Sequence, residues 1–196
     1  SMPAFSLNNA VDTLLKKEFD IHRAAGTRHP LMEHYGIDAV PLAHEQMDAW
    51  RDALRRGVVF HDADTNFQVT GGVDDIWTSP DGEFIVVDYK ATSTQREITL
   101  EGEYKEGYKR QLEVYQWLLR RNGHRVSRTG YFVYCNGTTD RAAFDAKLEF
   151  DIILLAYTGD DGWIPGTLRA MKTCLDSDEL PTVGETCEHC AYRVAA

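Results

Sequence analysis

The spacing of apolar residues along the chain predicts a series of helices. Val11, Leu15 and Phe19 recur at helical spacing, so we expect an amphipathic helix over Asn9–Ala25. Gly123 stands where the left-handed cap of a long helix belongs. Three further segments are expected to be helical: His44–Arg56, Glu101–Asn122 and Trp163–Leu175. The segment between the first two helices, Gly26–Pro41, is expected to be a loop.

Shorter apolar runs predict strands, and their order predicts the fold class. The expected extended segments are Val58–Phe60, Asn66–Thr70, Val69–Trp77, Phe84–Lys90, Thr129–Cys135 and Leu148–Tyr157. The turn Ser79–Gly82 joins the two most informative of them. Consecutive strands followed by a crossover helix and another strand predict an α/β protein with a mixed central sheet flanked by helices. Since no repeat or linker interrupts the chain, we expect residues 1–196 to form a single domain.

Acidic residues occupy strand positions that should be apolar. Asp88 follows a buried run and shares a strand face with Lys90, because strand side chains alternate. A salt bridge between these two would be a purely structural explanation. Asp74 and Asp75 are adjacent on the preceding strand, so one of them must point toward the Asp88 face. Acids on neighbouring strands repel each other unless a cation lies between them, and carboxylates suit Mg²⁺ or Mn²⁺. This chemistry suits phosphodiester hydrolysis.

Composition and charge narrow the class of protein. The 196 residues are 43% hydrophobic and 27% charged, as in an ordinary globular protein. The absence of an apolar run of membrane-spanning length and of an export signal, together with four cysteines, favours a cytoplasmic protein. The formal net charge of −10 argues against a protein that coats nucleic acid. It remains compatible with a nuclease whose active site is crowded with acids.

Three motifs follow one another along the chain: Gly71-x-Val73-Asp74, Asp88-x-Lys90 and Gln111-x-x-x-Tyr115. In this order they resemble the PD-(D/E)xK nuclease superfamily, and more narrowly its RecB-like branch, which includes the CRISPR-associated adaptation exonuclease. The resemblance implies a restriction-endonuclease-like core. It also implies a metal-dependent DNA nuclease, an exonuclease or end-processing enzyme, that works with Mg²⁺ or Mn²⁺ on single strands or duplex ends.

The resemblance also assigns metal ligands. In that branch the first acid stands three residues after a glycine and follows an aliphatic residue, which selects Asp74. Asp88 and the main-chain carbonyl of Tyr89 are the other expected oxygen ligands. The family has an upstream histidine ligand on a helix before the sheet, for which His44 and His61 are candidates. We favour His44 because it opens the expected second helix.

The resemblance gives roles to the long helix as well. Gln111 and Tyr115 are four residues apart and share a helix face, which packing on the sheet explains poorly for a glutamine. By resemblance they contact DNA or position the catalytic groups. Basic residues of the same helix are expected to contact the nucleic acid, with a solvated helix face as the alternative: Lys105, Lys109 and Arg110.

Lys90 is expected to stabilise negative charge in the transition state. It could also orient or deprotonate the attacking water. A base would have to lose its proton near neutral pH, and the neighbouring acids oppose that loss. We therefore favour charge stabilisation.

The cysteines depart from the family pattern. Many RecB-like nucleases hold an iron–sulfur cluster on four cysteines, one in the first helix and three in the tail. Here Cys187-x2-Cys190 is followed by Ala196 in place of the last cysteine, and Val11–Ala25 contains none. We therefore expect no iron–sulfur cluster. The pair is interpreted as a remnant or a weak zinc pair, with ordinary buried thiols as the alternative.

Two functions remain open from the sequence. The complete set of motif residues favours a nuclease. The acidic net charge and the incomplete cysteine set favour an inactive binding module of the same fold, which would hold nucleic acid or a protein partner.

Overall fold

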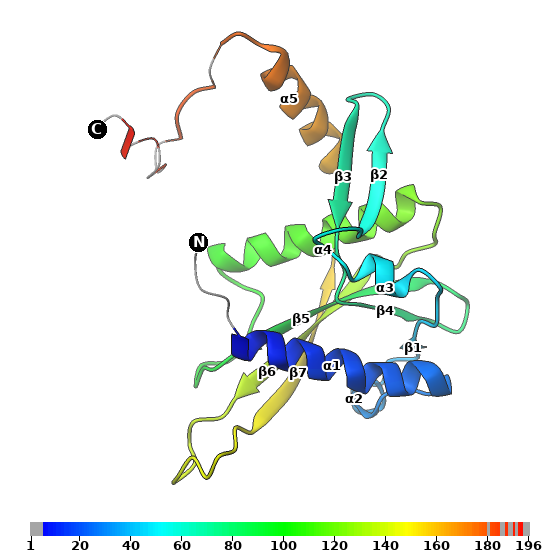
Figure 1. Ribbon diagram of the computed structural model, residues 1–196, viewed down its shortest axis with the longest axis vertical. Helices are drawn as coiled ribbons and strands as arrows, with labels where there is room; N and C mark the ends of the chain where they lie inside the picture. The colour runs from blue at the N-terminus through cyan, green and yellow to red at the C-terminus, as the bar shows by residue number, and fades with distance from the viewer. Residues whose placement is uncertain (1–5, 180, 185–186, 188–189, 191, 194–196) are drawn as a thin grey trace.

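The computed structural model describes residues 6–179, 181–184, 187, 190 and 192–193. Within them a mixed sheet of five strands forms the centre, in the order β1-β4-β5-β6-β7 (Figure 1). Its strands are β1 (Val40–Pro41), β4 (Asp75–Thr78), β5 (Phe84–Thr92), β6 (Thr129–Gly137) and β7 (Phe150–Thr158). The β5–β6 pair is parallel and the other neighbours are antiparallel. The architecture is the predicted mixed α/β sheet flanked by helices, consistent with a restriction-endonuclease-like core.

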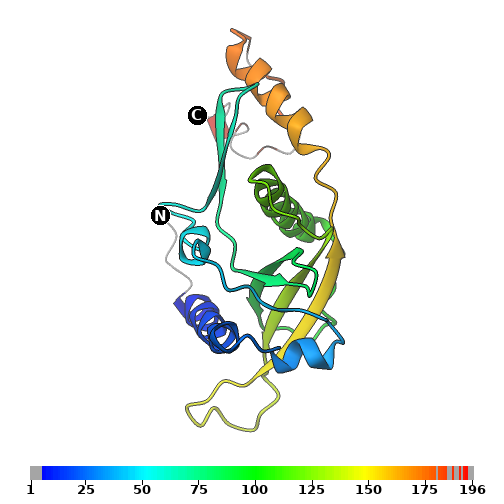
Figure 2. The same cartoon turned by 90° about the vertical axis from the view of Figure 1, so that its right-hand side faces the viewer.

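Two long helices cover opposite faces of this sheet. α1 (Ser6–Ala25) packs Leu15 and Phe19 on one face, and α4 (Glu103–Arg121) packs Leu112 and Leu118 on the other (Figure 2). Strand residues alternate between the two cores, as the pleat requires. Val87, for example, faces α1, and the preceding residue, Val86, faces α4. No helix among the described residues combines the length and the apolar character needed to cross a membrane.

The remaining elements surround this core. The hairpin of β2 (Val58–Asp62) and β3 (Phe67–Gly71) is separate from the sheet and extends toward α5 (Ile164–Asp176). The shorter helices are α2 (Pro30–His34) and α3 (Met47–Trp50). The segment predicted as a loop, Gly26–Pro41, therefore contains α2 and β1.

The predicted turns are confirmed. Gly82 donates its N–H to the Ser79 carbonyl at 2.9 Å and has φ 80°, which glycine adopts without strain. Gly123 has φ 88° just after α4, as expected of a left-handed helix cap.

Two predicted elements are shorter in the structure than the sequence pattern indicates. The expected strand Val69–Trp77 breaks after Gly71 and resumes at Asp75. At the break the backbone lies against Ala53, because a Cβ on Gly72 would meet the Ala53 Cβ at 2.3 Å.

The expected helix His44–Arg56 is also shortened. It is regular only over Met47–Trp50. The carbonyl of Trp50 accepts the N–H of Val73 at 3.1 Å, so tertiary hydrogen bonding replaces helix continuation here.

Candidate active site

The strand register decides which of the paired aspartates faces Asp88. Asp75 lies opposite Val87, and residues directly opposite each other in an antiparallel pair share a face. Val87 belongs to the core on the α1 side, so Asp75 points there. Asp88, the next residue on β5, therefore points to the other side. Asp74 precedes β4 and lies close enough to Asp88 for its charge to raise the pKa of that carboxyl. The structure thus brings Asp74 and Asp88 together.

Asp74 is held by main chain and by α1. Its Oδ2 accepts the backbone N–H of Tyr89 at 2.9 Å, and its Oδ1 lies 3.4 Å from Nζ of Lys16. Lys16 also pairs with Asp12 at 2.8 Å, so a second α1 acid stands near the site. In a strand the carbonyl of a residue leaves on the same side as its N–H, so the Tyr89 carbonyl faces the side of β5 on which Asp74 lies.

Asp88 and Lys90 form the centre of the arrangement. Asp88 is only 1% exposed, and its Oδ2 lies 2.5 Å from Nζ of Lys90. The Lys90 ammonium also donates to Oε1 of Gln111 at 3.2 Å and lies 4.3 Å from the centre of the Tyr108 ring. Lys90 therefore connects the strand acid to α4.

The predicted pair on α4 continues this connection. Gln111 Nε2 donates to the hydroxyl of Tyr115 at 2.7 Å. Burial raises the pKa of Tyr115 to about 12, and the negative charges of Asp88 and Asp74 act in the same direction. The hydroxyl therefore keeps its proton at neutral pH and can still donate it to another acceptor.

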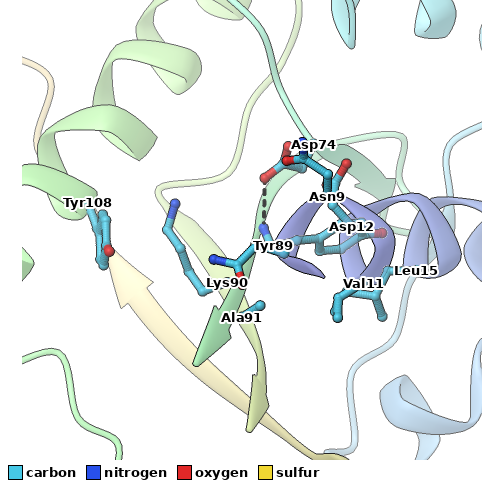
Figure 3. Close-up of a pocket in the computed structure, with 10 residues that line it drawn as sticks. Asn9, Val11, Asp12, Leu15, Asp74, Tyr89, Lys90, Ala91 and Tyr108 are labelled. Atoms are coloured by element: carbon cyan, nitrogen blue, oxygen red, sulfur yellow. Dashed lines mark hydrogen bonds between the residues drawn. The ribbon is translucent and has the colours of Figure 1, made fainter. Parts of the chain in front are cut away.

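Asp74, Lys90 and Tyr108 border a cavity of about 260 Å³ between α1, β5 and α4 (Figure 3). Figure 3 shows Lys90 extending toward Tyr108 on one side, with Asp12 of α1 on the other and Asp74 above. The cavity is open to solvent, and its lining includes Asp12, Asp74, Lys90 and Tyr108. An extended substrate could therefore reach Asp74 and Lys90, and Asp88 lies directly behind Lys90.

Electrostatics at the site favour the arrival of a cation. The pKa of Asp88 is raised to about 7, first by burial and then by the charge of Asp74, with Lys90 opposing. Burial also raises the pKa of Asp74, against the effects of Lys16 and the Tyr89 N–H. Two neighbouring carboxyls disfavour joint ionisation, and a cation between them would offset this repulsion.

The donor set fits Mg²⁺ or Mn²⁺. Among the described residues no group of three or more His, Cys, Asp or Glu side chains is arranged to hold a metal. Mg²⁺ commonly uses only one or two carboxylates and takes its remaining oxygens from water and substrate phosphate. Asp74, Asp88 and the Tyr89 carbonyl supply such a partial set, and Asp12 adds a nearby acid that the sequence reasoning missed.

Asp75 has a separate, structural role. It is fully buried on the α1 side, where it pairs with Arg23 and lies 3.2 Å from Nη2 of Arg51. The hydroxyl of Tyr89 donates to its Oδ2 at 2.8 Å. Arg51 also donates to the Asp74 carbonyl at 3.0 Å, so this ion network fixes the backbone beside the site.

The structure does not bring His44 to the two acids, which corrects the expected ligand set. His44 stacks on Trp50 with ring centres 4.4 Å apart and lies 6.1 Å from the ring of Phe84. Phe84 begins β5, four residues before Asp88, which is about 13 Å along a strand. His61 is no substitute, since it lies on the β2–β3 hairpin and pairs with Asn66 at 3.0 Å.

The basic residues expected to bind nucleic acid do not form one patch. Lys105 lies nearest the site, where its Nζ donates to the Tyr134 hydroxyl at 2.9 Å and lies 5.3 Å from the Tyr108 ring centre. Lys109 is engaged with Glu106 at 2.6 Å. Arg110 lines a different cavity, toward α5.

The cysteine pair lies in the tail. The sulfurs of Cys187 and Cys190 are 2.8 Å apart, and the N–H of Cys190 donates to Sγ of Cys187 at 3.3 Å. Ala196, where the family pattern has its last cysteine, lies outside the described residues. The expectation of no iron–sulfur cluster therefore stays a prediction.

Comparisons with known proteins address the family. No curated protein matches the chain. The solved structure described as "Crystal structure of SSO0001" is similar over 66% of this chain and 52% of that chain, with 21% identity and a TM-score of 0.35. The chain thus spans about half the length of that protein. The family model for the PD-(D/E)XK nuclease superfamily matches residues 6–195, almost the whole length. The chain belongs to the PD-(D/E)XK nuclease superfamily.

Proposed function

We propose that this protein is a divalent-metal-dependent deoxyribonuclease of the RecB-like branch that acts as an exonuclease or end-processing enzyme. The observation that carries the proposal is that Asp74 and Lys90 line an open cavity and that Asp88 lies against both of them. The order of the three sequence motifs supports the branch, and superfamily membership supports a nucleic-acid substrate. The activity would be hydrolysis of a phosphodiester bond.

Asp74, Asp88 and the Tyr89 carbonyl would hold the cation. A bound Mg²⁺ or Mn²⁺ would supply positive charge to the phosphate and favour loss of a proton from the attacking water. Asp74 is prepared for this by the Tyr89 N–H, which fixes its Oδ2 and leaves Oδ1 near Lys16. Lys16 and Lys90 hold the acids in place electrostatically and would need to shift when the cation binds.

Lys90 would stabilise the charge that develops on the phosphate oxygens. Its contact with Gln111 directs the ammonium toward α4 and the cavity, away from a simple pairing with Asp88 alone. Gln111 is in turn oriented by Tyr115. These two residues would therefore position Lys90. The O–H of Tyr115 could donate a hydrogen bond to a phosphate oxygen.

A nuclease assay tests the proposal. Labelled single-stranded and blunt duplex DNA would be incubated with the protein in Mg²⁺, Mn²⁺ or EDTA. We expect cutting only with a metal, and cutting slowed by about 100- to 1000-fold in Lys90→Ala. Lys147→Ala is the matched control, because Lys147 is exposed and pairs only loosely with Asp145 at 3.9 Å. Binding without any cutting in either metal would favour the inactive binding module.

A further inference from the structure

We propose that Tyr104 and Tyr108 form a stacking platform that receives unpaired bases of a single-stranded substrate beside Lys90. This inference rests on the proposed nuclease function, whose substrate it specifies. The platform lies on the first turns of α4 (Glu103–Arg121), adjacent to the cavity that Asp74 and Lys90 line.

Tyr104 is exposed but has a defined position. It is 77% exposed at the start of α4, and the Tyr108 hydroxyl donates to its hydroxyl at 3.0 Å. The two rings are 5.3 Å apart at 76°, an edge-to-face arrangement. Because most of Tyr104 is exposed, its ring remains accessible from solvent, as stacking with a base requires.

Tyr108 connects this exposed ring with the catalytic amine. Nζ of Lys90 lies 4.3 Å from the centre of its ring, and Nζ of Lys105 lies 5.3 Å from it. Lys105 is anchored on Tyr134. A strand whose base lies on Tyr104 would thus have the Lys105 ammonium nearby for its phosphate. From Tyr108 the strand would continue toward Lys90 and Asp74, which lie side by side at the cavity (Figure 3).

The charge distribution favours an unpaired strand over a duplex. The net charge is −10, and Lys109, the next lysine of the helix, is engaged with Glu106. Few cations are therefore available for two phosphate backbones. Stacking supplies affinity that does not depend on charge, but only an unpaired base offers its face. If the pair of tyrosines merely stabilises the helix start, it should not distinguish strands with and without bases.

Binding measurements in EDTA test the inference without cleavage. Fluorescence anisotropy would compare a short labelled oligothymidylate with an abasic strand of the same length, which has the same phosphates and no bases. We expect the full chain to prefer oligothymidylate by about 5- to 100-fold. Tyr104→Ala should remove most of this preference, and Tyr104→Phe should keep it. Phe144→Ala is the control, since Phe144 is 74% exposed in the distant β6–β7 connection.

The outcomes separate this inference from the proposed function. Equal or undetectable binding of the two strands, or a preference that survives Tyr104→Ala, overturns the platform. Tighter, Tyr104-dependent binding of a blunt duplex would also overturn it. Lys90→Ala should keep the preference while cutting slows by about 100- to 1000-fold. A protein that shows the preference but never cuts with Mg²⁺ or Mn²⁺ contradicts the nuclease activity alone.

Discussion

The backbone N–H of Tyr89 donates to Oδ2 of Asp74 at 2.9 Å, which ties an acid outside the regular strands to the strand that carries Asp88. The contact depends on the break before β4, because Asp74 lies between the two extended segments. The side chain of Tyr89 points to the α1 side of the sheet, where its hydroxyl donates to Asp75. Tyr89 therefore fixes both aspartates in their different roles.

Asp88 and Lys90 should fail in different ways when replaced. Asp88→Ala should weaken Mg²⁺ or Mn²⁺ binding by more than about 10-fold, since it removes a ligand. Lys90→Ala should leave metal affinity largely intact while the cutting rate falls by about 100- to 1000-fold, because it removes transition-state stabilisation. Isothermal titration with metal, together with single-turnover cleavage, distinguishes the two. Equal losses of metal affinity would refute this division of roles.

The metal-free Asp88→Asn variant should become increasingly more stable than the parent protein as the pH rises. The pKa of Asp88 in the folded state is about 7, above its ordinary value, so the folded protein binds more protons than the unfolded chain between about pH 4 and pH 7. Stability is therefore lost as the pH rises through this window, by at most about 1.4 kcal/mol per pH unit. Asparagine cannot ionise and escapes the loss. Urea unfolding in EDTA at pH 5 and pH 8 should show the advantage of Asp88→Asn growing with pH.

Metal provides the converse measurement. At pH 8 a saturating divalent cation should stabilise the parent protein and so raise its melting temperature. At a cation concentration of 100 times the dissociation constant, the added free energy of unfolding is about 2.7 kcal/mol. Asp88→Asn should respond much less. An advantage of the variant that does not change with pH would contradict the ionisation argument.

Replacement of Asp75 should lower the free energy of unfolding much more than replacement of the adjacent Asp74. Asp75→Ala removes the buried acid that Arg23 and Arg51 share and leaves them paired with the partly exposed Asp20, so we expect a loss of about 3–5 kcal/mol. Asp74→Ala removes one hydrogen-bond acceptor but also a like charge beside Asp88, so its effect should stay within about 1 kcal/mol. Chemical denaturation of both variants measures this difference. A reversed order would exclude the structural role of Asp75.

His44→Ala should leave metal affinity unchanged, because its ring lies among Trp50, Phe84 and His124 at the other end of β5. Isothermal titration with Mn²⁺ would compare it with Asp88→Ala, which serves as the positive control. A comparable loss of affinity in both variants would restore His44 as a ligand.

Local sequence patterns predicted most of the elements because short-range preferences dominate them. Leu15 and Phe19 marked the buried face of α1, and Gly82 and Gly123 marked a turn and a helix end. The failures lie where long-range contacts override those preferences. The helix expected from His44 is regular only over Met47–Trp50, because the Trp50 carbonyl is used by Val73.

The sequence by itself supplied the chemical groups of the candidate site, but the residue pattern alone left open which of the paired aspartates faces Asp88. It supplied two acids in succession, an Asp88-x-Lys90 motif and a Gln111 with Tyr115 one turn later. The resemblance to the nuclease family selected Asp74, but the physical reason came only from the tertiary structure, where the register of β4 on β5 directs Asp75 to two arginines while Asp74 lines the cavity. The tertiary structure also added Asp12, whose approach depends on how α1 packs across the sheet, a relationship that no local pattern encodes.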